Sequence, residues 1–177
     1  HRVAGDGTSN QSLGDGGLAL DATICGSPFL ATGPDGSLYF SEQQCHVIRR
    51  IRPDGIVERV AGTGVQATFG VVDEDIQALD APLSSTKDLA VGPDGTLYIA
   101  DSSSGVIRRV GTDGVISTVA GVPGGSPNLT VDVPAKGLGI ANPTVVAVAP
   151  DGSVLFDING IALRRVDTQG IVRMVVN

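Results

Sequence analysis

The chain has 177 residues, of which 25 are Gly and 10 are Pro, and only 3% are aromatic. Its 12 Lys and Arg stand against 19 Asp and Glu, and the net charge of −7 would repel a phosphate backbone, so we do not expect a nucleic acid partner. The 41% of hydrophobic residues excludes a disordered polyelectrolyte. No uninterrupted apolar stretch is long enough to cross a bilayer, so we expect no membrane insertion. The chain begins at His1 without a signal sequence, and we expect a processed or excised piece.

Four short motifs recur three times in a fixed order along the chain. The turn Pro34-Asp35-Gly36 comes back with its glycine at Gly95 and at Gly152, at intervals of 59 and 57 residues. Three further motifs follow each such turn: an Arg pair (48–50, 107–109, 163–165), a second turn (53–55, 112–114, 168–170) and a Val-rich end (60–62, 119–121, 175–177). This periodicity makes the chain a repeat protein with three units.

Each unit consists of short apolar runs separated by Gly, Pro and Asp. In the first unit these runs are 30–33, 38–41, 47–52 and 56–61, a spacing typical of strands and turns. We therefore predict four antiparallel strands per unit, A to D. The Pro-Asp-Gly turns join A to B and C to D on one common face, because Pro presets φ and Gly accepts a positive φ.

Long connections join strand D of one unit to strand A of the next, at 62–87 and 121–143. Loops of this length usually have a function or some structure of their own. The Ala- and Leu-containing pieces 18–24 and 76–83 are each expected to form one helical turn.

Four-stranded units that pack radially are the blades of a β-propeller. The fold class we predict is all-β, with three four-stranded antiparallel blades of a propeller that is partial or completed by other chains. The expected boundaries are 1–5 for the end of a preceding strand D, 6–62 for blade 1 with its long leading loop, 63–121 for blade 2 and 122–177 for blade 3. Because closed propellers have about 4–8 blades, blades 1 and 3 would each expose an apolar face.

Several segments resemble NHL-repeat propellers. Residues 33–40 and 92–101 resemble the A–B hairpin of that family, and 106–110 resembles its strand C. The run 3–22, with its Gly14-Asp15-Gly16-Gly17, resembles the variant in secreted teneurin-like and bacterial YD-repeat proteins. The family includes adhesion modules, sensor ectodomains, ligase substrate-binding domains, RNA binders and metal-dependent lyases, so the resemblance implies a fold and leaves the function open.

The two cysteines are predicted to form a disulfide. Cys25 lies just before strand A, and Cys45 lies in the B–C hairpin. Because strands alternate in direction, both segments emerge on the same side of a propeller. A Cys25–Cys45 disulfide would imply an oxidising compartment, and two free thiols are the alternative.

The Arg pairs are interpreted as structural, because a functional site rarely needs the same pair in every blade. One Arg of each pair, Arg49, Arg108 or Arg164, is expected to lie between blades and bond a carboxylate. Glu42 and Asp101 are the candidate partners.

Metal and catalytic sites are weakly indicated. The chain has only His1 and His46, whereas propeller lyases need several His around a channel. The acidic triplet Asp73-Glu74-Asp75 is a candidate contact loop, with a Ca²⁺ site as the alternative. No other cofactor and no catalytic residue is predicted. Asn10 and Asn128 each begin a glycosylation acceptor triplet.

We therefore expect a non-catalytic extracellular, secreted or cell-surface propeller segment that acts as a scaffold or protein-binding module. Its partners are expected to be further blades of the same parent chain or copies of itself. The alternatives are a self-assembling ring or filament protein and a metal-dependent propeller lyase or hydrolase.

Overall fold

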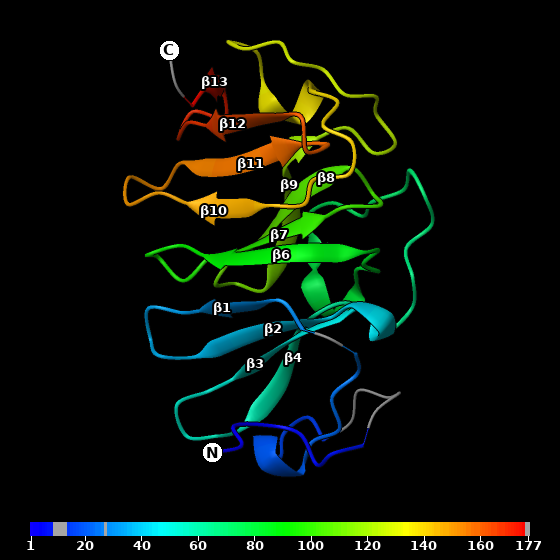
Figure 1. The fold of residues 1–177 in the computed structure, drawn as a ribbon, viewed down its shortest axis with the longest axis vertical. Coiled ribbons are helices and arrows are strands. Elements are labelled where there is room, and N and C mark those ends of the chain that lie inside the picture. Colours follow the sequence, from blue (N-terminus) through cyan, green and yellow to red (C-terminus); the bar gives the residue numbers. More distant parts are fainter. Residues whose placement is uncertain (9–13, 27, 176–177) are drawn as a thin grey trace.

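The computed structural model describes residues 1–8, 14–26 and 28–175. They form three antiparallel sheets that follow one another in chain order along the long axis of the molecule (Figure 1). Within the described residues, the other regular elements are four 3₁₀ turns of three residues each. The predicted all-β class is confirmed.

Each sheet contains the four strands predicted for its unit, paired A to B, B to C and C to D. The first sheet consists of β1 (Leu30–Thr32), β2 (Leu38–Glu42), β3 (Val47–Ile51) and β4 (Val57–Ala61). The second consists of β6 (Thr86–Val91), β7 (Leu97–Asp101), β8 (Val106–Val110) and β9 (Val115–Gly121), with β5 (Ile76–Gln77) beside β9. The third consists of β10 (Val146–Val148), β11 (Val154–Ile158), β12 (Ala162–Val166) and β13 (Val172–Met174).

The predicted turns connect strands at one end of the sheets. Gly36, between β1 and β2, has φ +84°, and Asp35 accepts hydrogen bonds from the N–H and the hydroxyl of Ser37 at 3.0 and 2.8 Å. The two turns of a sheet are neighbours, since a Cβ on Gly95 would lie 3.5 Å from Thr112 Cγ2. The turns β1–β2, β6–β7 and β10–β11 lie on the same side of the molecule (Figure 1). We call this end the turn face, and the opposite end, with the B–C hairpins, the hairpin face.

Each sheet carries one more segment than the four predicted strands. In the second sheet this segment is β5, in which Ile76 pairs with Ile116 of β9. Isolated bridges take the same place in the other sheets, between Leu18 and Ile56 and between Pro134 and Ile171. The expectation of four strands per sheet was therefore incomplete. In each sheet, the segment that precedes strand A forms backbone hydrogen bonds with the free edge of strand D of the same sheet.

A 3₁₀ turn follows each of these segments: η1 (Ala19–Asp21), η3 (Ala78–Asp80) and η4 (Ala135–Gly137). The first two confirm the predicted helical turns. Ala78 joins two sheets, because its carbonyl accepts from the N–H of Gly62 after β4 and its N–H donates to Gly114 O before β9, at 2.9 and 2.8 Å. Gly5 N–H donates to Ala19 O in the same way, at 2.9 Å. No strand is assigned to residues 1–5, so their origin as the end of a strand D stays a prediction.

Apolar side chains fill the two spaces between successive sheets. Tyr39 and Ile48 of the first sheet belong to one buried cluster with Ile99 and Ile116 of the second. The cluster between the second and third sheets is built in the same way, from Tyr98, Ile107, Val154, Phe156, Val166 and Val172 among others. Sheet-on-sheet burial is therefore repeated along the chain, as a radial stack of sheets requires.

The outer faces of the first and third sheets differ. Phe40, on the outer face of the first sheet, is only 3% exposed, because it packs in a cluster with Ala19 and Ala22 of the connecting segment. Leu163 of the third sheet is 55% exposed, although its counterparts Ile48 and Ile107 are fully buried. The prediction of an exposed apolar face is thus wrong for the first sheet, and it holds for Leu163 of the third sheet.

Candidate functional site

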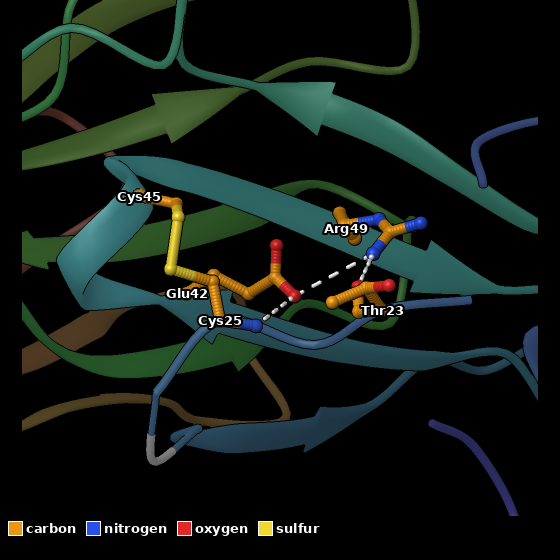
Figure 2. The surroundings of a disulfide bond; sticks show 5 residues. All are labelled: Thr23, Cys25, Glu42, Cys45 and Arg49. Carbon is orange, nitrogen blue, oxygen red and sulfur yellow. Dashed lines mark hydrogen bonds and ion pairs between the residues drawn. A yellow bond between two sulfur atoms is a disulfide. The ribbon is translucent and has the colours of Figure 1, made fainter. Parts of the chain in front are cut away.

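The hairpin face of the first sheet is held by a disulfide between Cys25 and Cys45, as predicted. Cys25 lies just ahead of β1, and Cys45 ends the 3₁₀ turn η2 (Gln43–Cys45) in the hairpin between β2 and β3 (Figure 2). The N–H of Cys25 also donates to Glu42 Oε1 at 2.9 Å. Covalent and hydrogen bonds therefore fix the same point of the loop to one hairpin.

Arg49 is buried in the middle of this region, and its side chain is fully inaccessible. Its Nη1 donates to Thr23 O at 2.9 Å and lies 3.5 Å from Glu42 Oε1, and its Nε donates to Asp15 Oδ1 at 2.9 Å (Figure 2 shows the first two). The guanidinium also lies over the ring of Phe40, 5.8 Å from the centroid. The predicted contact with Glu42 is present, but Arg49 lies between the first sheet and its own connecting segment and not between two blades, because it packs on Phe40 of the outer face. Asp15 was missed in the sequence, although its spacing of 59 residues from Glu74 follows the repeat.

The second sheet contains a related but looser arrangement. Arg108 and Asp101 are both buried, and Asp101 Oδ1 accepts the N–H of Ser84 at 3.2 Å, as Glu42 does for Cys25. The predicted bond from Arg108 to Asp101 is not among the described contacts, because Arg108 Nη2 donates to the carbonyl of Asp73 instead. Burial lowers the pKa of Arg108 and raises the pKa of Asp101, and the charge of each opposes the shift of the other.

The third sheet has lost this arginine site. Ile158 stands where Glu42 and Asp101 stand in the other sheets, and Arg164 is only half-buried, with Nη2 donating to Leu129 O at 2.8 Å. The neighbouring Asp157 takes over the task of holding the start of strand A, and its Oδ1 accepts from the backbone N–H groups of Thr144 and Val145 at 2.5 and 2.8 Å. A carboxylate at the end of strand B thus holds the start of strand A in every sheet.

The acidic triplet lies on the outside of the second sheet and attaches to it. Glu74 accepts hydrogen bonds from the N–H of Thr118, at 2.8 Å, and from the Thr118 hydroxyl. Asp75 has a φ of +55° and donates its N–H to Ile116 O, while the Asp73 carbonyl receives Arg108. All three residues are exposed, so a role as a contact loop stays a prediction.

The first hairpin also touches the second sheet. Gln43 Nε2 donates to Ser85 Oγ at 2.6 Å, and His46 Nδ1 lies 3.0 Å from Ser84 O. His46 has a φ of +51° at the corner of the hairpin. Through its contact with Ser84, His46 connects the first hairpin to the segment ahead of β6 on the hairpin face.

The remaining predicted site residues are placed as follows. Asn128 is exposed, and its Oδ1 accepts from the N–H and the hydroxyl of Thr130 at 2.9 and 2.6 Å. Asn10 lies outside the described residues.

Among the residues that the structure describes, no three His, Cys, Asp or Glu side chains gather to hold a metal ion. None of the helices found there has the length and apolar character needed to cross a membrane.

No protein-family model matches the chain. It is 30% identical over 157 residues to Teneurin-m of Drosophila melanogaster, a match that covers 80% of this chain and 6% of that protein. It is 32% identical over 102 residues to Teneurin-3 of Mus musculus, covering 52% of this chain and 4% of the relative. The chain therefore spans a small part of the curated relatives that it matches.

Solved structures with a similar fold are propeller-like proteins of several kinds. A Bacteroides thetaiotaomicron protein of unknown function superposes with a TM-score of 0.62 at 25% identity, over 84% of this chain and 37% of that one. The Staphylococcus aureus virginiamycin B lyase (TM-score 0.54, 17% identity, 85% and 42% covered) and a chain of the nidogen/laminin complex (0.57, 17%, 84% and 47%) follow the same fold. These likenesses define a propeller-type fold, and they extend neither to the NHL repeat nor to a blade count.

Proposed function

We propose that the chain is a non-catalytic extracellular β-propeller segment, which serves as a scaffold and binds protein through its hairpin face. The observation that supports this most directly is the double attachment of Cys25, by a disulfide to Cys45 and by a hydrogen bond to Glu42. Loops on a rigid support commonly carry recognition, because little conformational entropy is lost when they bind. The buried carboxylates at this end accept hydrogen bonds from backbone N–H groups, so their role is structural.

Two observations support an extracellular location. Disulfides persist in oxidising compartments, and the first hairpin carries one. The curated relatives with similar sequences are teneurins, proteins that the resemblance described above places among secreted ones.

The binding face is tested by a photo-crosslinking amino acid placed at one of two exposed positions. One variant carries it at Gln44, on the hairpin face, and the other at Asp54, in a turn of the same sheet on the opposite face. On intact cells we expect protein crosslinks from position 44 and few from position 54. Equal crosslinking from both positions would contradict a preferred hairpin face.

A metal-dependent propeller enzyme is the competing interpretation, and titration with Ca²⁺ or Zn²⁺ separates the two. A cation held in a channel would bind the folded state alone and would raise the melting temperature as its concentration exceeds Kd. We expect no change in melting temperature at millimolar Ca²⁺ or micromolar Zn²⁺. A rise of several degrees would favour the enzyme.

We further propose that another blade covers the outer face of the third sheet. We expect this blade to belong to the same parent chain, and the second-ranked occupant is another copy of this chain. Leu163 is 55% exposed on this face, whereas its counterparts Ile48 and Ile107 are fully buried between sheets. If copies cover this face, sedimentation of the 177-residue chain will show concentration-dependent association that Leu163→Asp abolishes. A wild-type monomer at high micromolar concentration would leave only the parent blade as the occupant.

A further inference from the structure

Two grooves lie at equivalent places between successive sheets on the turn face. The smaller, about 290 Å³, separates the first and second sheets and includes Tyr39 and Arg50 in its lining. The larger, about 580 Å³, separates the second and third sheets and includes the counterparts Tyr98 and Arg109. The repeat thus presents the same Tyr and Arg twice, in grooves whose volumes differ twofold.

In the smaller groove the arginine already holds a carboxylate. Arg50 Nε donates to Glu58 Oε1 at 2.9 Å, and Nη2 donates to the same oxygen. Arg50 Nη1 lies 3.4 Å from the hydroxyl of Tyr39, and the guanidinium stands 5.9 Å from the centre of that ring. Glu58 therefore acts as an internal ligand of a Tyr–Arg pair.

In the larger groove this carboxylate is missing. Ser117 pairs with Arg109 in the sheet as Glu58 pairs with Arg50. Arg109 Nε donates to Ser117 Oγ at 3.1 Å, and the two Nη atoms have no hydrogen-bond partner among the residues that the structure describes. Arg109 is exposed to solvent, so its guanidinium is open to a ligand. The carboxylate that binds Arg50 thus has no counterpart beside Arg109, whose hydrogen-bond partner is the Ser117 hydroxyl.

The other charges around the larger groove also favour an anion. Lys136 of η4 lines it, at the position that Leu79 of η3 holds in the smaller groove, and Lys136 is exposed. Asp167 is the acidic residue of the lining, but its Oδ2 accepts from Arg173 Nε at 2.9 Å and its Oδ1 accepts from the backbone N–H of Ile171 at 3.0 Å. Asp94 of the turn between β6 and β7 also lies close enough to Arg109 to interact with its charge, but its two oxygens accept hydrogen bonds from the N–H and the hydroxyl of Thr96 at 3.1 and 2.9 Å. Two exposed cations thus stand against two carboxylates that are already hydrogen-bonded.

We propose that the larger groove binds the carboxylate of an acidic ligand, namely a Glu or Asp side chain of a peptide. Arg109 would take this carboxylate as Arg50 takes Glu58, with Lys136 as the second cation and Tyr98 as the wall against which the side chain lies. This site lies on the turn face and is separate from the hairpin face proposed above for protein binding. Its experimental test is therefore independent of the test of that function.

The test is an NMR titration of the ¹⁵N-labelled 177-residue chain with three probes: capped glutamate, the free dicarboxylate glutarate, and capped glutamine as the neutral match. We expect capped glutamate to shift the amide signals of Ser117, Thr118 and Lys136, with a Kd on the order of millimolar for a single small group. Capped glutamine should leave these signals in place. Shifts with glutarate alone would overturn the peptide source, and equal shifts with glutamine would overturn carboxylate recognition.

Variants within the repeat sharpen this test. Arg109→Gln should weaken binding about tenfold or more, the loss of one charge-assisted bond. Arg165→Gln removes the counterpart arginine on the third sheet, where it pairs with Asp151, and should leave binding unchanged. Ser117→Glu should occupy the groove from within and abolish the shifts, whereas Glu58→Ser should open the smaller groove as a second site. Unchanged binding by a folded Ser117→Glu chain would overturn the proposal.

Discussion

Arg49 Nη1 lies 3.5 Å from Glu42 Oε1, and both side chains are fully buried. Such a pair adds little net stability, because removing two charges from water costs about as much as their attraction returns. Its role here is positional: Glu42 also accepts the N–H of Cys25, and Arg49 also holds the carbonyl of Thr23. The pair thus fixes the connecting segment against the first sheet.

Removing Glu42 alone should cost more stability than replacing both members of the pair by apolar residues. Glu42→Ala leaves the Arg49 charge short of one partner and the Cys25 N–H unsatisfied, and we expect the free energy of unfolding in urea to fall by about 3 kcal/mol. The double variant Glu42→Ile with Arg49→Leu places an apolar pair there and should recover the part of the loss that comes from the buried charge, while the Cys25 N–H and the Thr23 carbonyl stay unpaired. A double variant less stable than Glu42→Ala would contradict this account.

The disulfide should stabilise the chain by restricting its unfolded state. Cys25 and Cys45 are 20 residues apart, and loop-closure entropy for such a spacing corresponds to about 3 kcal/mol. Replacing both cysteines by Ser should lower the free energy of unfolding in urea by that amount, and reducing the wild type with dithiothreitol should reproduce the loss. Mass spectrometry of unreduced peptides identifies the bond directly, and two alkylatable thiols in native material would disprove it.

Gly62, at the end of the first Val-rich motif (60–62), should tolerate no side chain. A Cβ on Gly62 would lie 2.2 Å from His46 O and 2.8 Å from Val47 Cα, and Gly62 has a φ of +90°. Gly62→Ala should therefore destabilise the chain by roughly 3 kcal/mol, from backbone strain and overlap together. Gly55→Ala is the matched control, since its φ of +83° carries the strain while nothing lies within 4 Å, and about 1 kcal/mol is expected. Equal losses would show that the overlap is relieved by movement of the hairpin.

Acid should unfold the chain through its turn carboxylates. The backbone N–H and then the hydroxyl of Ser37 lower the pKa of Asp35 from 3.8, and those of Thr96 lower the pKa of Asp94 in the same way. A lowered folded pKa gives stability that is present above pH 3.8 and is lost as the pH falls through the folded value. The urea concentration at the unfolding midpoint should therefore decrease when the pH is lowered below about 4. This decrease should be smaller in Asp94→Asn than in the wild type.

Asp101 should act in the opposite direction. Burial raises its pKa from 3.8, so its contribution to stability grows as the pH falls through the folded value toward 3.8. Asp101→Asn removes this compensation and should make the loss of stability in acid steeper. A shallower acid limb in Asp101→Asn would contradict the sign of this shift.

Much of the fold follows from local features of the sequence. Pro34-Asp35-Gly36 specifies a tight turn by itself, because Pro, Asp and Gly each favour its backbone angles, and the regular recurrence of such motifs predicts strands, their order and the shared face of the turns. The same alternation of strand directions placed Cys25 and Cys45 at one end of a sheet, where they are bonded. These inferences need only distances along the chain and the geometry of antiparallel strands.

Other features depend on contacts between units, which spacing along the chain does not specify. Phe40 is buried because the connecting segment with Ala19 folds over it, so the outer face of the first sheet is covered without another blade. Arg108 donates to the Asp73 carbonyl although Asp101 is the nearer candidate in sequence, since the side-chain path is set by packing between sheets. The sequence by itself determined the strands and turns through local backbone preferences. The tertiary structure alone decided which faces are covered and which arginines are left free, because these depend on the space between neighbouring sheets.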